Sequence, residues 1–281
     1  FTSSDWFMDG PTGIGAKFGG TVSAAGDVNN DGFDDILVAS IGYSQPGGKG
    51  KVFLYLGSAN GPSMSSDWNN RGTWEDVIQG WSMAAVGDTN DDGFDDIAIG
   101  AAGSFSDITG NGRVGVYTGS ATGIMTLDNR WTTTTTNTLL GYAVAGIGDI
   151  NQDGFDDVAF TEPLYDNSAL GRVSIVLGSS AGLPSNPDMQ IVGTESSQIL
   201  GSAVSLIGDI NDDGVEEIAI SSIGLGTSNG KVEYYFADSN QLLRAGVNPL
   251  LIEGVSGQHL GRTITGGGDV DGDGQFEILV T

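Results

Sequence analysis

A stretch of nine residues occurs five times in this chain of 281 residues, at intervals of 60 or 61 residues. The first copy, residues 27–35, reads DVNNDGFDD, and the others begin at Asp88, Asp149, Asp209 and Asp269. Every copy has oxygen-bearing side chains at positions 1, 3, 5 and 9 and glycine at position 6. A regular period of this length predicts a repeat architecture, in which each unit buries its apolar surface against its neighbours.

The spacing of these oxygens suits a hard cation. Alternate side chains fold inward around the ion, glycine permits the sharp turn, and the carbonyl of position 7 adds a ligand. Asp, Asn and Gly also make ordinary turns, but an acid at position 9 in all five copies favours a calcium loop over that alternative. Mg²⁺ fits less well, because it prefers an octahedral shell rich in water. The sequence therefore predicts up to five bound Ca²⁺ ions.

The loops are not helix–loop–helix calcium sites, which need a glutamate at position 12. Position 12 is apolar in every copy, and each loop runs into a short apolar segment such as residues 36–39 or 97–99. Apolar runs of this length are typical of strands that are buried on both faces. The cation is therefore expected in a turn between two strands.

Each repeat has the same four segments in the same order. A segment of small residues precedes the loop, an apolar segment follows it, and a third segment opens with Gly-Lys/Arg-Val. A more polar fourth segment closes the unit, at residues 67–72, 129–134, 188–193 and 248–254. Small residues suit the crowded centre of a ring and polar residues its exposed edge, so the pattern predicts an all-β fold: a β-propeller of four-stranded antiparallel blades. The threonine run 132–136 is expected in such an edge strand.

Two further motifs make the likeness to a known family specific. A hydrophobic-Gly pair or a variant of it stands nine residues before each loop, at Phe18-Gly19, Gln79-Gly80, Leu140-Gly141, Leu200-Gly201 and Leu260-Gly261. A Gly-Ala-Pro-like element follows the second segment, as at residues 100–102 and 161–163. Over nearly its whole length the chain resembles FG-GAP repeats, the units of the integrin α-subunit propeller and of many bacterial surface proteins. It departs from the family pattern in that only the first pair is literally Phe-Gly.

The resemblance implies Ca²⁺ between strands 1 and 2 of each blade, on one face of the propeller, and ligand binding by the 2–3 and 4–1 loops on the opposite face. The implied calcium ligands are the side chains of positions 1, 3, 5 and 9 and the carbonyl of position 7: Asp27, Asn29, Asp31, Phe33, Asp35, Asp88, Asn90, Asp92, Phe94, Asp96, Asp149, Asn151, Asp153, Phe155, Asp157, Asp209, Asn211, Asp213, Val215, Glu217, Asp269, Asp271, Asp273, Gln275 and Glu277. The position-8 acids Asp34, Asp95, Asp156 and Glu216 are expected to be solvated, because position 8 points away from the ion.

The repeats predict a single propeller region over residues 1–281. Residues 1–15 are expected to be the fourth strand of a preceding blade, and the blades to cover residues 16–77, 78–138, 139–198 and 199–258, with a partial blade at 259–281. The chain thus holds about 4.6 repeats, whereas integrin propellers have seven blades. We expect further polypeptide, in the same chain or in a neighbour, to complete a larger ring, for which the resemblance implies seven blades.

The charge of the chain limits its partners. The chain has 36 acidic and 10 basic residues, a formal net charge of −26 and no cysteine, and 22 of the acids lie in the five loops. Nucleic acid and anionic membrane surfaces are poor partners for such a chain, and no apolar run reaches the length of a membrane span. The resemblance implies an extracellular or cell-surface protein whose ligand is a protein or a glycan.

Aromatic residues mark the candidate ligand site. The connections between strands 2 and 3 differ most among the repeats, and they carry Tyr43, Phe105 and Tyr165. Variable loops on a repeated scaffold are where recognition usually resides, although aromatic residues that shield the rim between blades are an equally good interpretation. Trp6 and Trp68 share the context S-S-D-W, and both are expected to pack between blades.

A catalytic function is not favoured. His259 is the only histidine and is expected in a surface loop, and the carboxylate pairs are accounted for by metal. We therefore predict a calcium-stabilised adhesion or ligand-binding module without a catalytic site. A structural subunit of an extracellular assembly and a carbohydrate-binding or hydrolytic propeller are the alternatives. Self-association in calcium would favour the first, and a glycan-array signal or turnover would favour the second.

Overall fold

The structure is a computed structural model of the chain. It describes residues 7–10, 17–43, 49–72, 78–103, 111–133, 135, 137–166, 168–224, 229–238, 241–245, 252–255, 259–272 and 276–281. Every helix or strand assigned in these ranges is a β-strand, which confirms the all-β prediction. No helix in these ranges has the length and apolar character needed to span a membrane.

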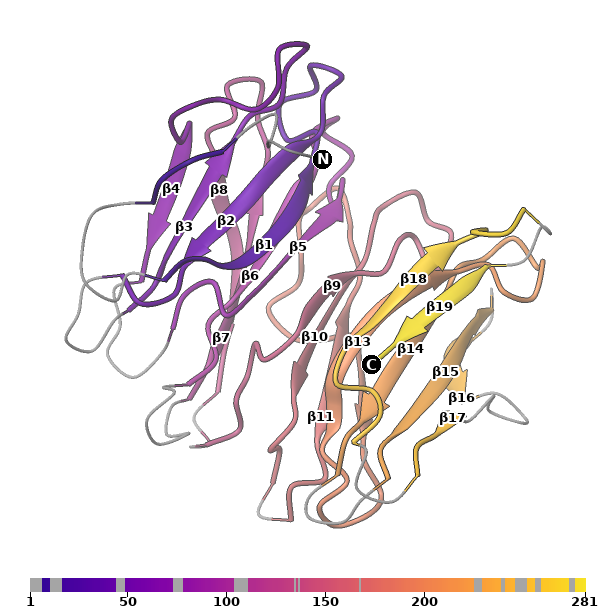
Figure 1. Ribbon diagram of the computed structural model, residues 1–281. Helices are drawn as coiled ribbons and strands as arrows, with labels where there is room; N and C mark the ends of the chain where they lie inside the picture. The colour runs from indigo at the N-terminus through magenta and orange to yellow at the C-terminus, as the bar shows by residue number, and fades with distance from the viewer. Residues whose placement is uncertain are drawn as a thin grey trace.

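The strands form five antiparallel sheets in chain order, which we call blades 1 to 5 (Figure 1). Blade 1 contains β1 (Phe18–Gly26), β2 (Asp35–Ser40), β3 (Lys51–Tyr55) and β4 (Trp68–Arg71). Blade 2 contains β5 (Ser82–Gly87), β6 (Asp96–Gly100), β7 (Arg113–Thr118) and β8 (Thr126–Thr132). Blade 3 contains β9 (Val144–Gly146), β10 (Val158–Glu162), β11 (Arg172–Val176) and β12 (Met189–Val192). Blade 4 contains β13 (Leu200–Gly208), β14 (Glu217–Ser222), β15 (Lys231–Asp238), β16 (Gln241–Ala245) and β17 (Ile252–Glu253). The described part of blade 5 contains β18 (Ile264–Gly268) and β19 (Glu277–Val280).

The hydrophobic core lies between successive blades. The second strands of blades 2, 3 and 4 are buried on both faces, since every residue of β6, β10 and β14 is buried. Leu37 of blade 1 shares a cluster with Ile97 of blade 2, and Val114 of blade 2 shares another with Phe160 of blade 3. Since the apolar face of each blade is covered by the next, no blade completes its core alone.

The first strands lie next to one another, as their small residues predict. They touch in the order β1, β5, β9, β13 and β18. A Cβ at Gly146 of β9 would lie 2.7 Å from the carbonyl oxygen of Ala85 in β5, and one at Gly266 of β18 would lie 2.9 Å from that of Leu206 in β13. In the described residues no contact of similar extent joins β18 to β1. Completion of a larger ring, and the predicted blade boundaries, therefore stay predictions.

The outer edges differ from the sequence prediction in two blades. The edge strand β8 ends at Thr132, which pairs with Arg113, the first residue of β7. Thr132 therefore lies in the edge strand as predicted, whereas Thr133 and Thr135 lie beyond it and their prediction as strand is wrong; Thr134 and Thr136 are outside the described residues. In blade 4 the third strand β15 is longer than its counterparts, so two short strands, β16 and β17, pair with its two ends.

Aromatic packing joins the outer part of blades 1 and 2. The rings of Trp68 in β4 and Tyr117 in β7 meet edge-to-face, with centroids 5.5 Å apart. Such pairs stabilise beyond the area that they bury, which confirms the predicted packing role of Trp68. Trp6 lies outside the described residues.

Glycine makes a second joint between blades, at the residue before each third strand. These glycines have φ between +56° and +81°: Gly50, Gly112, Gly171 and Gly230. A Cβ at Gly171 would collide with the carbonyl oxygen of Leu200 in the next blade. The N–H of Leu200 donates to the carbonyl of Leu170 at 3.1 Å, which holds the two backbones together. Both the φ value and the lack of space require glycine here.

Replacing Gly171 by alanine tests this joint. The matched control is Gly61→Ala, because Gly61 has φ +95° but no atom within 4 Å of an added Cβ. We expect Gly61→Ala to cost about 1–2 kcal/mol of unfolding free energy from backbone strain alone, and Gly171→Ala about 3 kcal/mol or more, because overpacking adds to the strain. Urea unfolding measures both values, and equal losses would contradict the proposed close contact between blades.

Candidate functional site

Each nine-residue loop turns from the first strand of a blade to the second. The position-6 glycines of the first four loops have φ between +86° and +94°, and nothing lies within 4 Å of a Cβ at Gly32. Backbone conformation rather than crowding therefore requires glycine here. Position 4 is also left-handed, with φ +54° at Asn30 and +60° at Gln152. Sequence reasoning missed this second turn, although Asn and Asp, which tolerate the conformation best, occupy position 4 in three of the copies.

Backbone N–H groups orient the expected ligand side chains. In the first loop the two carboxylate oxygens of Asp27 accept from the N–H of Asp31 at 3.0 Å and of Gly32 at 2.7 Å. The side-chain oxygen of Asn29 also accepts from Asp31, and that of Asp31 accepts from Phe33. The same bonds recur in the second, third and fourth loops. The sequence thus folds so that three polar side chains turn toward the middle of each of these four loops.

The position-9 acid connects the loop to the strands of its blade. Asp35 is 1 % exposed, and its carboxylate accepts from the N–H of Val28 at 3.0 Å and of Gly57 at 2.7 Å. Val28 belongs to the loop and Gly57 follows the third strand, so one carboxylate ties three segments together. The equivalent acids Asp96 and Asp157 make the same two contacts.

Burial of these acids disfavours their ionised form and raises their pKa values. Desolvation raises the pKa of Asp35 to about 6 and the pKa values of Asp96, Asp157 and Glu217 to about 7. The backbone donors lower each pKa, but they only partly offset burial, and neighbouring loop acids raise it further. A cation among these oxygens would hold the carboxylates in their ionised form.

The donor set fits a calcium ion. Oxygens of Asp209, Asp213 and Glu217 lie within 4.8 Å of one another in the fourth loop. The same is true of Asp269, Asp271 and Glu277 in the fifth loop, whereas three carboxylates do not come so close elsewhere in the described chain. Asp273 and Gln275 lie outside the described residues. All donors are oxygen, which suits a hard cation such as Ca²⁺ and excludes a soft thiolate site. A bound ion would supply two positive charges to each loop.

Two of the four position-8 acids join neighbouring loops, so the prediction that they are solvated is wrong for these two, whereas Glu216 is exposed as expected. A carboxylate oxygen of Asp95 accepts from the N–H of Asp27, the position-1 residue of the preceding blade, at 2.8 Å. Asp156 binds the N–H of Asp88 in the same way at 2.9 Å. Burial raises the pKa of Asp156. Asp34 is exposed, as expected.

The same inter-blade position is occupied at all four blade junctions. The glycines before the first four loops have φ between +66° and +79°: Gly26, Gly87, Gly148 and Gly208. A Cβ on each would collide with, or lie within 2.6 Å of, the position-8 side chain of the next blade. In the fifth loop that side chain is Phe276, which packs on Gly208 in place of an acid. Position 8 is therefore a contact between repeats, and its side chain faces the neighbouring blade.

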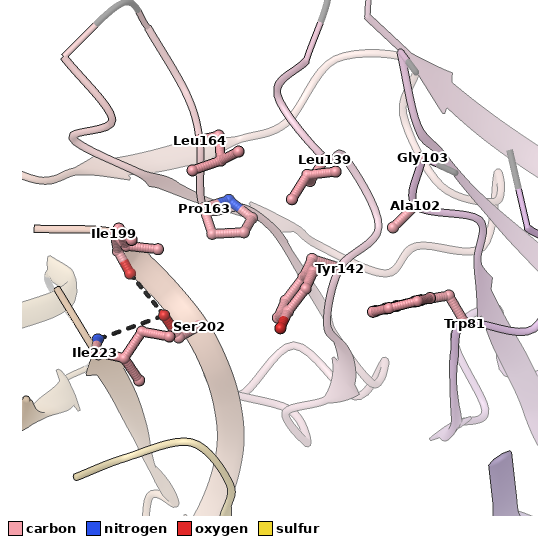
Figure 2. Close-up of a pocket in the computed structure, with 10 residues that line it drawn as sticks. All are labelled: Trp81, Ala102, Gly103, Leu139, Tyr142, Pro163, Leu164, Ile199, Ser202 and Ile223. Atoms are coloured by element: carbon pink, nitrogen blue, oxygen red, sulfur yellow. Dashed lines mark hydrogen bonds between the residues drawn. The ribbon is translucent and has the colours of Figure 1, made fainter. Parts of the chain in front are cut away.

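A pocket lies at the opposite ends of the first and second strands (Figure 2). This aromatic pocket has a volume of about 370 Å³, and blades 2, 3 and 4 each contribute residues to it: Trp81, Ala102, Gly103, Leu139, Tyr142, Pro163, Leu164, Ile199, Ser202 and Ile223. The rings of Trp81 and Tyr142 lie 5.7 Å apart and are tilted by 41°. Ser202 is held in place, because its hydroxyl donates to the Ile199 carbonyl at 2.8 Å.

The sequence prediction placed ligand binding in the 2–3 and 4–1 loops at this end, but it did not name Trp81 or Tyr142. Trp81 and Tyr142 directly follow the glycine of the hydrophobic-Gly pair. This shared position in two repeats is the sequence feature that could have indicated them. Tyr43 and Tyr165 do not line the pocket; they lie against the cationic residue that opens the third strand of their own blade. The Lys51 ammonium is 5.3 Å from the Tyr43 ring centre, and the Arg172 guanidinium is 3.9 Å from that of Tyr165. Phe105 lies outside the described residues.

Two remaining polar residues are accounted for by structure. The ring nitrogen Nδ1 of His259 lies 3.3 Å from the carbonyl oxygen of Ile223. Glu162, which is 2 % exposed, accepts from Nε of Arg172 at 2.7 Å. Neither contact assembles a nucleophile with a base, and both suit a role in packing.

Comparison with known proteins identifies the repeats. Residues 18–55, 80–117 and 140–176 match the FG-GAP repeat. Similar proteins include integrin alpha-6 of Gallus gallus, 31% identical over 194 residues, which are 63% of this chain and 16% of that protein. Integrin alpha-8 of Mus musculus is 31% identical over 223 residues (76% and 20%), and integrin alpha-5 of Xenopus laevis is 28% identical over 223 residues (73% and 20%).

The chain is therefore built of FG-GAP repeats, folded as four-stranded antiparallel blades. It is a distant homologue of integrin alpha subunits. It spans no more than about a fifth of the length of these relatives.

The stability of the chain should depend on calcium, and this dependence should vary with pH. At about 100-fold excess over Kd, one site adds about 2.7 kcal/mol. Without calcium the position-9 carboxylates titrate at about 6 to 7 in the folded chain and near 4 when unfolded. The folded chain then binds more protons between these values, so lowering the pH from 8 to 6 should raise the Tm in chelator.

Protons compete with calcium for the same oxygens, so the increase in Tm that calcium produces should be larger at pH 8 than at pH 6. Thermal melts at both pH values, with calcium and with chelator, measure this difference. Asp31→Ala should reduce the increase without abolishing it. Equal midpoints with and without calcium would contradict the calcium assignment.

The inter-blade role of position 8 can be tested with two identical substitutions. Asp95→Ala removes the bond to Asp27, and we expect it to cost about 1–3 kcal/mol, because a backbone N–H loses a charged acceptor. Asp34→Ala is the control at the same loop position on an exposed side chain, where about 0.5 kcal/mol or less is expected. Urea unfolding in saturating calcium compares them; similar losses would rule out the contact as a stabilising one.

Proposed function

We propose that this chain is a calcium-stabilised ligand-binding or adhesion module of an extracellular or cell-surface protein. Its distant homology to integrin alpha subunits supports the proposal, as do the acidic loops whose donors are all oxygen. The observation that carries the proposal is the division of each blade into two ends. The loops close one end of the first and second strands, and the aromatic pocket lies at the other.

The aromatic pocket is the ligand site that we propose. It combines an apolar floor with two large rings, and Trp81 and Tyr142 are both partly exposed. Tryptophan and tyrosine are enriched among the residues that carry most of the energy of binding interfaces. Because three successive blades supply the lining, the pocket exists only when the blades are stacked. Calcium would therefore act on recognition indirectly, by keeping the loop ends of those blades in place.

Binding rather than turnover is the activity that we propose. The acids with raised pKa values are the loop carboxylates, which already have a role as oxygen donors. His259 lies beside the backbone carbonyl of Ile223. Perturbed carboxylates that are arranged as oxygen donors suit a metal-stabilised scaffold better than a catalyst.

The proposal is tested with immobilised extracellular-matrix proteins and a glycan array as probes. We expect at least one probe to bind the full chain in calcium and to be released by chelator. The double substitution Trp81→Ala/Tyr142→Ala should weaken that binding by tenfold or more, since it removes both rings.

Tyr43→Ala is the matched control, because Tyr43 is an aromatic residue that does not line the pocket. It should leave the affinity unchanged. A Tm within 2 °C of the parent chain would show that the double variant is folded. Binding that survives both the double substitution and chelator would overturn the proposed site, and no binding to any probe would overturn the proposed function.

A further inference from the structure

A second pocket, the arginine pocket, lies between the outer strands of blades 1 and 2. It has a volume of about 320 Å³, and its lining shares no residue with the aromatic pocket. Its main polar residues are Asn70, Arg71, Gln79, Arg113, Tyr117 and Arg130. Volumes of this size are typical of sites for small molecules.

The pocket exists because β7 has a glycine in its middle. At the corresponding position the other third strands have Phe53, Ser174 or Glu233. A Cβ at Gly115 would lie 3.1 Å from the Tyr117 ring, so a larger side chain there would enter the space. Gly115 pairs with Arg130 of the edge strand β8, which brings the guanidinium group to the rim. The opening is therefore a local feature of blade 2 and not a property of every repeat.

Positive charge is concentrated in this pocket, although the whole chain carries a net charge of −26. Three of the 10 basic residues line it, and none of its described lining residues is acidic. Burial and, after it, the nearby charge of Arg130 lower the pKa of Arg113. Burial raises the pKa of Tyr117, while Arg130 acts in the opposite direction. The charges of Arg113 and Arg130 are thus close enough to interact, and an anion bound beside the exposed Arg130 would be attracted by both.

An ordered row of neutral polar groups lies beside these charges. The Gln79 amide donates to the side-chain oxygen of Asn70 at 3.1 Å. The Asn70 amide in turn donates to the Tyr117 hydroxyl at 3.2 Å. The row crosses from blade 1 to blade 2. The Gln79 and Asn70 side chains both hydrogen-bond to Tyr117, whose hydroxyl proton can be donated to a ligand. Leu127, which is exposed, supplies apolar surface next to the row.

We propose that the arginine pocket binds an acidic saccharide, that is, a sugar ring that carries a carboxylate or a sulfate. Guanidinium groups match the planar oxygens of such an anion and bind it through paired hydrogen bonds. The Asn70–Gln79–Tyr117 row offers hydrogen-bonding groups to ring hydroxyls, and Leu127 offers contact to the C–H face. An acidic peptide would satisfy the arginines but would make less use of the amides. This inference does not depend on ligand binding at the aromatic pocket.

The experiment is a calorimetric titration of the full chain in calcium at low ionic strength. The probes are glucuronic acid, N-acetylglucosamine 6-sulfate, neutral glucose, inorganic sulfate and a di-glutamate peptide. We expect both acidic sugars to bind at least about tenfold more tightly than glucose, sulfate or the peptide. Their affinity should fall as salt is added. Arg130→Gln should lower the affinity for both acidic sugars at least about tenfold, because it removes a charged donor at an exposed position.

Two further variants keep the result interpretable. Arg262→Gln removes one positive charge at an exposed site in blade 5, so it should leave binding unchanged if the pocket, and not overall charge, is responsible. Gly115→Ser, which introduces the residue of blade 3, should weaken binding by partly filling the space. Absence of binding by the acidic sugars, equal affinity for inorganic sulfate or the peptide, or equal losses in the Arg130 and Arg262 variants would each overturn the proposal.

Discussion

Buried carboxylates at the ends of the strands are the constraint on which the rest of this structure depends. Each position-9 acid of the first four loops is 0 or 1 % exposed, and within the described residues none of them forms an ion pair. Their hydrogen bonds alone do not cover the cost of burying an ionised group. A proton or a cation must supply the remainder, and oxygens that turn inward suit a hard cation. A cation bound there would join the strand ends around it into one structural unit.

Neighbouring units are joined at both ends of the blades. At the loop end, the carboxylate of Asp95 binds the backbone of the preceding loop. At the other end, backbone meets backbone where a left-handed glycine such as Gly171 leaves no space for a side chain. A change in one loop therefore acts on its neighbours through short polar contacts. The same stacking creates the two pockets, since each draws its lining from more than one blade.

The sequence predicted the periodic features and missed those that depend on contacts between repeats. Alternating loop oxygens, apolar second strands and small first strands each follow from local geometry, and all appear in the structure. Position 8 was interpreted from the direction of its own strand, but its environment is set by the blade before it. The aromatic pocket was missed for the same reason, because Trp81 and Tyr142 come together only when two blades stack. The extent of β8 depends on where its partner β7 begins.

The central claim is that the five loops are calcium sites, and a count of bound ions tests it most directly. Native mass spectrometry of the full chain in calcium gives this count, and it can be repeated with variants in which one position-5 aspartate, such as Asp31, is replaced by asparagine. The account predicts saturation at five Ca²⁺ ions per chain and a loss of one ion in each variant. Saturation without bound calcium, or a count that the substitutions do not change, would contradict it.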